Sequence, residues 1–463
     1  MFTAILLITS LLSSPSRAFS PPPTWEALQS TPSLANRPSP PIYHDALPES
    51  LDGSLSSKLP VLYRDKECIC AACESVWLAL EVKNVEYVTV LIDGRNHDGQ
   101  FMLPHITWHD DHDDVTINAK STTSDPVQLL EQIQKRYPDT PPQFYPPLSS
   151  AVDASRCNIL RLPGVMPRNS DSNLQSLAPY LFRSDGTLVQ PSSHAVSLEE
   201  VEEMQEEYYL GDFLCGKSIT AADLIWAPYL ERYAVQLPIV YENRARLNPR
   251  NRNLYGEVDN WYKVMEEEVA AYSCRVMGDA RHWRRCLEVA TSVHNERVVG
   301  EEERVSLPNV PDERGWWMKT KKNNRAGEIW SEYCSNRPWL APTPGGEVAL
   351  FLIRNRENIM DAAVVALDDC FDSNTADESL REVIQVLLEW DVYFDQSSEE
   401  ETAQPLSERG LRMALFVAEE MIQVPRDLGM IPVGVLWEVI RSCNGIVGES
   451  VSGSIGEQAG AVV

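Results

Sequence analysis

The sequence predicts an α+β protein with more than one domain, and three observations support this. At 463 residues, the chain is longer than a single hydrophobic core usually supports, so two or three domains are expected. Patterns typical of strands are confined to residues 58–140, and from residue 141 onward the patterns are helical. A strand-containing part followed by an all-helical part is typical of α+β architecture.

The first predicted domain, residues 58–140, has the element order β-α-β-loop-β-β-α. The β-branched runs "KLPVLYRD" and "VEYVTVLID" predict strands on either side of a helix that runs from Cys70 to about Lys83. Two short strands, "FMLPHITW" and "DVTINA", follow and are joined by the polar turn "HDDHDD". The amphipathic stretch "DPVQLLEQIQKRYP" predicts a final helix that ends at Pro138.

Helices are predicted through most of the remaining chain. Residues 141–295 form a predicted helical domain, and its best start signal is "SITAADL", where Thr220 can cap a helix and Asp223 completes a capping box. Residues 296–345 contain few apolar repeats and are expected to connect this domain to a further helical region, residues 346–446. The Gly/Ser-rich residues 447–463 are expected to be disordered.

The N-terminus has the features of a targeting sequence. Residues 1–18 contain "MFTAILLITSLL", an apolar run too short to span a bilayer and typical of a secretory signal. Cleavage after Ala18 would leave Phe19 at the new terminus, a junction that resembles the bipartite presequences of algae with complex plastids. The Pro- and Ser-rich residues 19–57 are expected to be a disordered, transit-like leader. A plastid location is predicted, with secretion as the alternative.

Charge and cysteine content exclude several classes of protein. The formal net charge is −28, whereas binding to nucleic acid or to anionic membranes requires clustered Lys and Arg. We therefore expect no nucleic-acid partner, and we expect no membrane span in the mature chain. Ten cysteines in a chain of this length are too few for a disulfide-stabilised secreted scaffold, so a reducing compartment is favoured.

Three cysteines are concentrated in "ECICAACESVWLAL", where the first predicted strand leads into its helix. C-x-C-x-x-C supplies at most three thiolates without a second pair downstream, so no structural metal site is predicted. At a helix start, backbone N–H groups and the helix dipole would stabilise a thiolate on Cys70. Cys73 lies one turn further on, close enough to resolve a mixed disulfide on Cys70. The alternative is that the cysteines are small core residues.

Several of these segments resemble the glutathione transferase superfamily. "LYRDKECICAACESVWLALEVKNVEY", the Leu103-Pro104 pair and "DPVQLLEQIQKRYP" are similar to its thioredoxin-fold N-terminal domain. "LCGKSITAADLIWAPYLERYAVQLP" is similar to its helical C-terminal domain. The resemblance covers about residues 58–290 and is nearest to the Cys-type omega and lambda classes. The later helices, with "GGEVALFLIRNRENIMDAA", resemble the C-terminal extension of plant and algal glutathione transferase-like proteins.

The resemblance implies roles for individual residues. Cys70 would be the catalytic nucleophile, and Cys73 a possible resolving thiol. Leu103, followed by a cis-Pro104, would pair its backbone with glutathione, and Asp125 would contact the ammonium group of glutathione. Pro126 stands where the family has a serine, which could weaken glutathione binding roughly ten- to a hundred-fold unless nearby Ser124 or Thr123 takes over its role.

Other residues leave two interpretations open. Trp226 and Tyr229 would line a hydrophobic substrate pocket, or pack an apolar helix face. The histidines and aspartates of "HITWHDDHDDV" could bind a divalent metal, but a solvated turn is preferred. Arg354 and Arg356, together with the Arg426-Asp427 segment, could form an ionic tie between C-terminal helices or bind an anion, and we prefer the tie.

The resulting hypothesis is an enzyme with glutathione-dependent thiol transfer, deglutathionylation or conjugation through a cysteine nucleophile. Glutathione would be its cosubstrate, a small hydrophobic or disulfide compound its second substrate, and no cofactor would be permanently bound. Two alternatives belong to other classes. One is a non-catalytic carrier of a hydrophobic ligand on the same fold, and the other is an interaction protein that works through its C-terminal helices.

Overall fold

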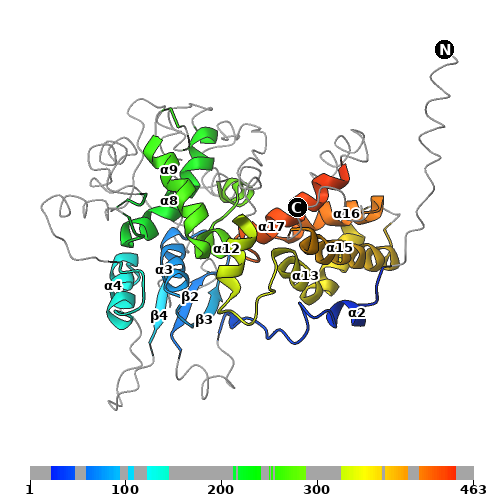
Figure 1. The fold of residues 1–463 in the computed structure, drawn as a ribbon, viewed down its shortest axis with the longest axis horizontal. Helices are drawn as coiled ribbons and strands as arrows, with labels where there is room; N and C mark the ends of the chain where they lie inside the picture. The colour runs from blue at the N-terminus through cyan, green and yellow to red at the C-terminus, as the bar shows by residue number, and fades with distance from the viewer. Residues whose placement is uncertain are drawn as a thin grey trace, which may run out of the picture.

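A four-stranded mixed sheet occupies one side of the molecule in the computed structural model (Figure 1). The strand order is β1-β3-β2-β4, where β1 and β2 run parallel to β3 and β4 runs antiparallel to β2. The strands are β1 (Ile42–His44), β2 (Val61–Asp65), β3 (Val88–Ile92) and β4 (His105–Thr107). The structure describes residues 22–46, 59–93, 103–108, 123–144, 212–214, 217–240, 250, 252–253, 256–287, 325–367, 371–394 and 406–444.

Helix α3 (Ala71–Val82) joins β2 to the parallel strand β3. It is apolar on nearly all sides, as expected for a helix that is covered all round. The helix ends in a Schellman motif, in which Asn84 has a φ of 50° and Val85 N–H donates to the carbonyl of Leu80 at 3.1 Å. A β-α-β unit followed by an antiparallel strand fits a thioredoxin-like arrangement, and the α+β class is confirmed. The predicted strand "DVTINA" lies outside the described residues.

Two helices pack around α3. They are α4 (Pro126–Arg136) and α8 (Ala221–Val240). Asp223 plays the part predicted for it in the capping box of α8. Its carboxylate accepts hydrogen bonds from both N–H and Oγ1 of Thr220, at 2.7 and 2.9 Å. Its second oxygen accepts from Trp261 Nε1 at 2.9 Å. That tryptophan belongs to α9 (Gly256–Glu268), so the cap also fixes the next helix.

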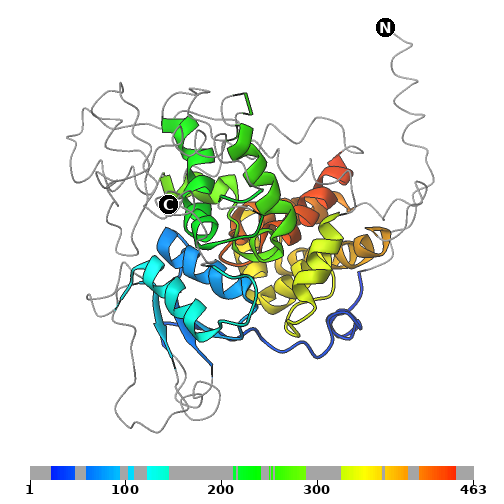
Figure 2. The same cartoon turned by 60° about the vertical axis from the view of Figure 1, so that its left-hand side comes forward.

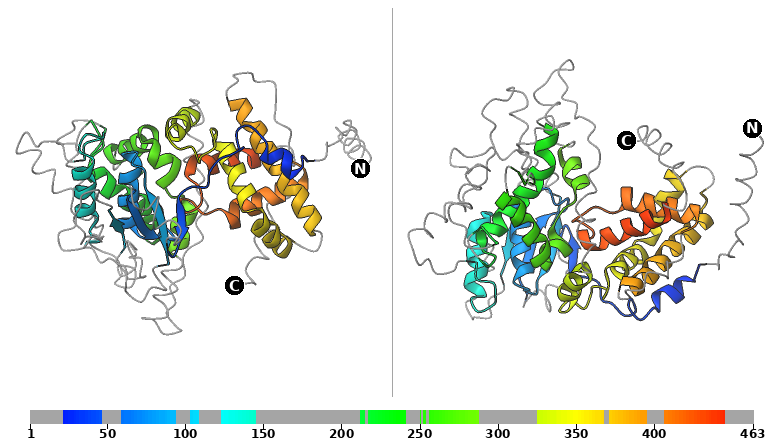
Figure 3. Two further views of the ribbon diagram at one scale, coloured as in Figure 1. Left: turned by 90° about the horizontal axis from the view of Figure 1, so that it is seen from below. Right: turned by 45° about the horizontal axis from the view of Figure 1, so that its top comes forward.

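The C-terminal helices lie beside the sheet-containing part (Figure 3). They share one continuous hydrophobic core with it, through α9 and the π-helical turn η3 (Tyr272–Val276). These elements are α12 (Arg325–Cys334), α13 (Pro344–Arg354), α14 (Arg356–Ala366), α15 (Ser373–Phe394), α16 (Glu408–Phe416), the π-helical turn η6 (Val417–Met421) and α17 (Met430–Asn444). Helix α12 falls within residues 296–345, which were predicted only to connect two helical regions. In the part of the chain that the structure describes, no helix is long and apolar enough to cross a membrane.

Close backbone approach fixes the C-terminal region against η3. A Cβ atom at Gly429 would lie 1.7 Å from the carbonyl oxygen of Cys274, so only glycine fits there. Arg275 Nη1 also donates to the carbonyl of Asp427 at 3.2 Å. The contact between the two regions is therefore made by backbone as well as by side chains.

Ordered structure begins earlier in the chain than the sequence predicted. Helix α2 (Trp25–Gln29) and strand β1 lie inside residues 19–57, which were expected to be a disordered leader. Trp25 Nε1 donates to Asp377 Oδ1 of α15 at 2.6 Å, and Leu28 and Leu34 are buried in the main core. Figure 2 shows this dark blue segment running along the C-terminal helices to the sheet. The Pro-rich composition concealed Trp25, whose partner Asp377 lies 352 residues away.

Candidate functional site

Cys70 caps the N-terminus of α3. Its backbone is extended (φ −75°, ψ 110°), and its Sγ accepts a hydrogen bond from the N–H of Cys73 at 3.4 Å. The helix therefore starts where the sequence predicted, with this sulfur at its positive end. Cys70 is only 3% exposed. It packs in a small apolar cluster with Cys73, Leu103 and strand residues Val61, Val88, Val90 and Ile92.

The segment before the helix, residues 65–70 (the cysteine loop), is organised by Asp65. One carboxylate oxygen accepts from the N–H groups of Ile69 and Cys70, at 2.7 and 3.0 Å, and the other accepts from Glu67 N–H at 3.2 Å. Asp65 is buried, and this burial raises the pKa of its carboxyl group. Asp65 was not among the residues predicted from the sequence, although an acid at the end of an apolar strand is a typical acceptor for the turn that follows.

The three cysteines of the motif do not converge. Cys68 has a φ of 56°, and its sulfur accepts from Arg64 Nη1 at 2.9 Å, away from the cluster that holds Cys70 and Cys73. Burial raises the pKa of the Cys68 thiol and raises the pKa of Cys73 well above its ordinary value. At neutral pH both are therefore protonated and poorly nucleophilic.

Arg232 of α8 holds the cysteine loop from the helical side. Its Nη2 donates to the carbonyls of Cys68 and Ile69, at 3.4 and 3.2 Å, and to Glu74 Oε2 at 2.7 Å. The guanidinium group also lies 3.9 Å from the ring centre of Trp283. Burial raises the pKa of Glu74, and the neighbouring Arg232 opposes that rise. The only hint in the sequence was a charged pair, "ER", inside the apolar run of α8.

Arg426 holds the same loop from the C-terminal region. It donates to Glu67 Oε2 at 3.3 Å and forms a second ion pair with Asp427 at 3.0 Å. Arg354 instead donates to the carbonyl of Pro38 at 2.9 Å. The expected ionic tie between the Arg354 and Arg426 segments is therefore wrong, because the N-terminal segment and the cysteine loop supply nearer acceptors.

Two of the predicted glutathione-binding residues lie at this site. The Leu103–Pro104 peptide bond is cis, as the resemblance implied, and Leu103 packs in the cluster that contains Cys70. Asp125 is instead an exposed cap of α4, with Oδ1 accepting from Val127 N–H at 3.0 Å. Among the described residues it makes no hydrogen bond to Cys70 or Leu103. Pro126 is the first residue of that helix.

The remaining candidates are dispersed. Trp226 and Tyr229 are buried in the main core, with exposed fractions of 0% and 4%, which agrees with the packing alternative. Their assignment to a substrate pocket stays a prediction. His105 is buried in β4, its ring 5.6 Å from that of Tyr63. His109 and His112 lie outside the described residues.

His282, which contacts the cysteine loop, makes the stability of the folded protein depend on pH. Burial, and then the charge of Arg232, lower the pKa of His282 to about 3, although its hydrogen bond to the backbone of Cys68 acts in the other direction. The folded protein therefore excludes a proton that the unfolded chain accepts below about pH 6.5. Stability should be lost as pH falls from about 6.5 towards 3, by about 3 kcal/mol at pH 4 from this group.

The measurement is urea unfolding at pH 7 and pH 4 for the wild type and His282→Gln. The variant is less stable at pH 7 because it loses the contact with Cys68, but it should lose about 3 kcal/mol less between the two pH values. Other groups titrate equally in both proteins, so the difference isolates His282. The same pH dependence in both proteins would contradict the expectation.

Comparisons with known proteins give a limited result. No family model matches the sequence, and no curated protein matches it. Solved structures that it resembles include glutathione transferase Omega 3C from Trametes versicolor, at 14% identity and a TM-score of 0.30, over 47% of this chain and 89% of that one. Glutathione transferase Omega 1C from the same organism matches at 15% identity and a TM-score of 0.31, over 51% and 96%. A likeness at this level assigns no activity to this chain.

Proposed function

We propose that the protein is a glutathione transferase-like enzyme of the Cys type, with Cys70 as the nucleophile that transfers glutathionyl groups. The observation that carries the proposal is the position of the Cys70 sulfur. It caps the N-terminus of α3 and packs beside Leu103, which precedes the cis-Pro104. The mixed sheet order around it is consistent with a thioredoxin-like domain. Glutathione is the cosubstrate, and no permanently bound cofactor takes part.

The proposed cycle uses two thiol–disulfide exchanges. The Cys70 thiolate attacks the glutathionyl sulfur of a mixed disulfide, forms a disulfide with it and releases the substrate thiolate, which takes up a proton. A glutathione thiolate then attacks the disulfide on Cys70, which yields oxidised glutathione and regenerates the Cys70 thiolate. The helix N-terminus stabilises the negative sulfur at the start and end of the cycle. Burial raises the pKa of Cys73, which favours this monothiol route over resolution by Cys73.

Access to the sulfur is part of the proposal. Because Cys70 is 3% exposed, a disulfide reaches its sulfur only when the surrounding chain opens. The exposed carboxylate of Asp125 would contact the ammonium group of glutathione. Pro126 has no N–H group, so it would leave the γ-glutamyl carboxylate of glutathione without that donor. We therefore expect weak binding of glutathione and turnover limited by opening.

The experiment that tests the proposal is the glutathione-dependent reduction of hydroxyethyl disulfide by the full-length protein. Turnover above the uncatalysed rate, with a glutathione adduct located on Cys70 by mass spectrometry, is the expected result. Absence of turnover, or an adduct on another cysteine while Cys70 stays unmodified, would overturn it.

We also propose a plastid location, with the targeting information in residues before Pro22. The packing of residues 22–46 against the sheet and α15 supports retention of this segment in the mature protein. A fluorescent fusion of residues 1–55 should enter the plastid of an alga with a complex plastid, and Phe19→Ala should leave the fusion outside the stroma. Secretion of the unmodified fusion would contradict the plastid assignment.

A further inference from the structure

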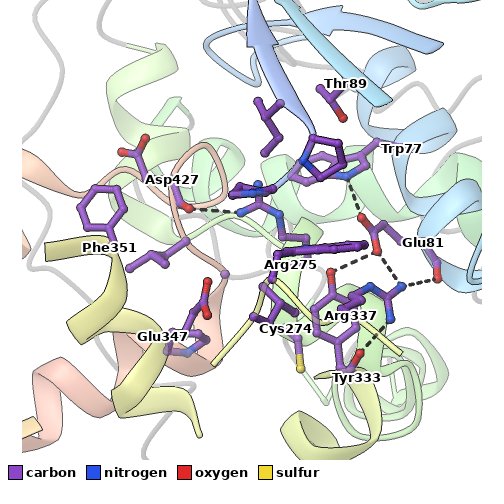
Figure 4. A pocket seen from close by; sticks show the side chains of 18 of the residues that line it. Trp77, Glu81, Thr89, Cys274, Arg275, Tyr333, Arg337, Glu347, Phe351 and Asp427 are labelled. Carbon is purple, nitrogen blue, oxygen red and sulfur yellow. Dashed lines mark hydrogen bonds and ion pairs between the residues drawn. The ribbon is translucent and has the colours of Figure 1, made fainter. Parts of the chain in front are cut away.

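A cavity lies apart from Cys70, between the sheet edge and the C-terminal helices (Figure 4). Its volume is about 490 Å³, and its walls come from β1, the end of α3, η3, α12, α13 and the loop before α17. This volume is in the range of sites for small organic ligands. Cys70, Cys73, Leu103 and Asp125 do not line it, so the cavity is not part of the thiol site.

The walls of the cavity are rich in aromatic rings. Six aromatic residues line it: Trp77, Tyr87, Trp330, Tyr333, Trp339 and Phe351. They come from two parts of the chain that are distant in sequence, residues 77–87 and residues 330–351. Flat, apolar walls of this kind favour a ligand with a planar or bulky apolar body.

Two arginines in the cavity wall form no ion pair with a carboxylate of the described residues. The guanidinium carbons of Arg64 and Arg275 lie 3.9 and 5.1 Å from the ring centre of Trp77. Arg64 is 2% exposed, and its Nε has no hydrogen-bond partner. Arg275 donates only to a backbone carbonyl, that of Asp427, in the bonds that Figure 4 marks. In the described part of the chain neither arginine belongs to an ion pair. A buried positive charge such as that of Arg64 is costly unless an anion lies near it, whereas Arg275 is half-buried and can still reach a ligand.

The carboxylates around the cavity do not supply that anion, because most of them are already engaged. Glu81 accepts from Tyr87, Tyr333 and Arg337, at 2.6, 3.0 and 2.8 Å.

Asp427 pairs with Arg426, which lies outside the cavity lining. Glu347 accepts from Ala341 N–H at 2.7 Å, and burial raises the pKa of its carboxyl group. Glu86 is exposed at the rim. The charge of Arg275 lowers the pKa of Glu81 and opposes the rise in the pKa of Glu347, and Arg64 acts on Glu74 in the same way, but none of these carboxylates forms an ion pair with either arginine among the described residues. Arg275 can therefore still donate to the carboxylate of a ligand.

We propose that this cavity binds an amphipathic organic anion, a carboxylate carried on an aromatic or polycyclic body. The ring system lies against Trp339 and Phe351, and the carboxylate accepts from Arg275. The buried guanidinium group of Arg64, which packs on the same Trp77 ring as Arg275, adds positive charge nearby. Arg275 Nη1 and Asp427 O hold the two walls together at 3.2 Å, so the site exists only when the C-terminal region is seated on η3. This inference does not depend on thiol chemistry at Cys70.

The test uses 2-naphthoate and its neutral isostere 2-naphthamide as probes, titrated calorimetrically into the full-length protein. The carboxylate should bind about ten- to a hundred-fold more tightly than the amide, because it alone forms a charge-assisted hydrogen bond with Arg275. Arg275→Gln should abolish most of this preference. Arg409→Gln, which removes an exposed arginine of α16, should preserve it.

Two further measurements locate the site. Asn336→Trp narrows the mouth of the cavity from an exposed position and should weaken binding of both probes, even if Arg275→Gln fails to fold. Saturating glutathione should leave naphthoate binding unchanged. Equal affinity for the two probes, unchanged naphthoate binding in Asn336→Trp, or displacement by glutathione would each overturn the proposal.

Discussion

Cys70→Ser is expected to reduce glutathione-dependent thiol transfer by roughly a thousand-fold or more, to the uncatalysed rate. Serine preserves the size of the side chain and can still accept the hydrogen bond from the Cys73 N–H, so the start of α3 should keep its geometry. It cannot form a disulfide with the glutathionyl group, which removes the covalent step. The measurement is the initial rate with hydroxyethyl disulfide at saturating glutathione, with far-UV circular dichroism as a check on folding.

Cys73→Ser is the matched control for this prediction. Cys73 lies one turn further along the same helix and is 2% exposed. Burial raises the pKa of its thiol, so it should contribute little thiolate to the cycle. We expect this variant to keep most of the activity. Loss of activity in both variants would indicate a dithiol cycle with Cys73 as the resolving thiol. Full activity in Cys70→Ser would remove Cys70 from the mechanism.

Elements with strong local patterns could be predicted from the sequence. The strands β2 and β3, the start of α3 at the cysteines and the cap of α8 all depend on residues that are close in sequence. The short elements α2 and β1 could not, because they form through tertiary contacts. Trp25 is fixed by Asp377, and β1 exists only as an edge strand on β3. Helix α12 was missed because its apolar residues Ile329, Trp330 and Tyr333 cover little more than one turn.

The candidate site also contains some residues that could be predicted from the sequence and others that could not. Cys70 could be predicted because a strand, a loop and a helix start follow one another within a few residues. The support of its loop could not, because Arg232 and Glu74 are 158 positions apart and neither has a distinctive neighbourhood in the sequence. The cavity could not be predicted from the sequence either, because Trp77, Arg275 and Phe351 come together only after the C-terminal helices have packed. Periodicity indicates which residues are buried, but it does not indicate which buried charges meet.

Arg232→Met is expected to destabilise the protein by about 3–5 kcal/mol, the usual cost of removing one partner of a buried ion pair. Methionine fills much of the arginine volume, so the loss is electrostatic rather than a cavity effect. Glu74, with a side chain that is 2% exposed, would be left without its cation. The carbonyls of Cys68 and Ile69 would lose their donor as well. The measurement is the free energy of unfolding in urea at pH 7.

Two comparisons separate this mechanism from general damage to the core. Glu74→Gln in the Arg232→Met background removes the unpaired charge and should recover part of the loss. Arg325→Ala breaks an exposed pair with Glu267, in which the side chains are 35% and 40% exposed, and should cost less than about 1 kcal/mol. Arg232→Met should also speed alkylation of Cys70 in the native protein, because the cysteine loop is released and the sulfur is uncovered. An effect on stability as small as that of Arg325→Ala, with an unchanged alkylation rate, would mean that Asp65 holds the loop without help from α8.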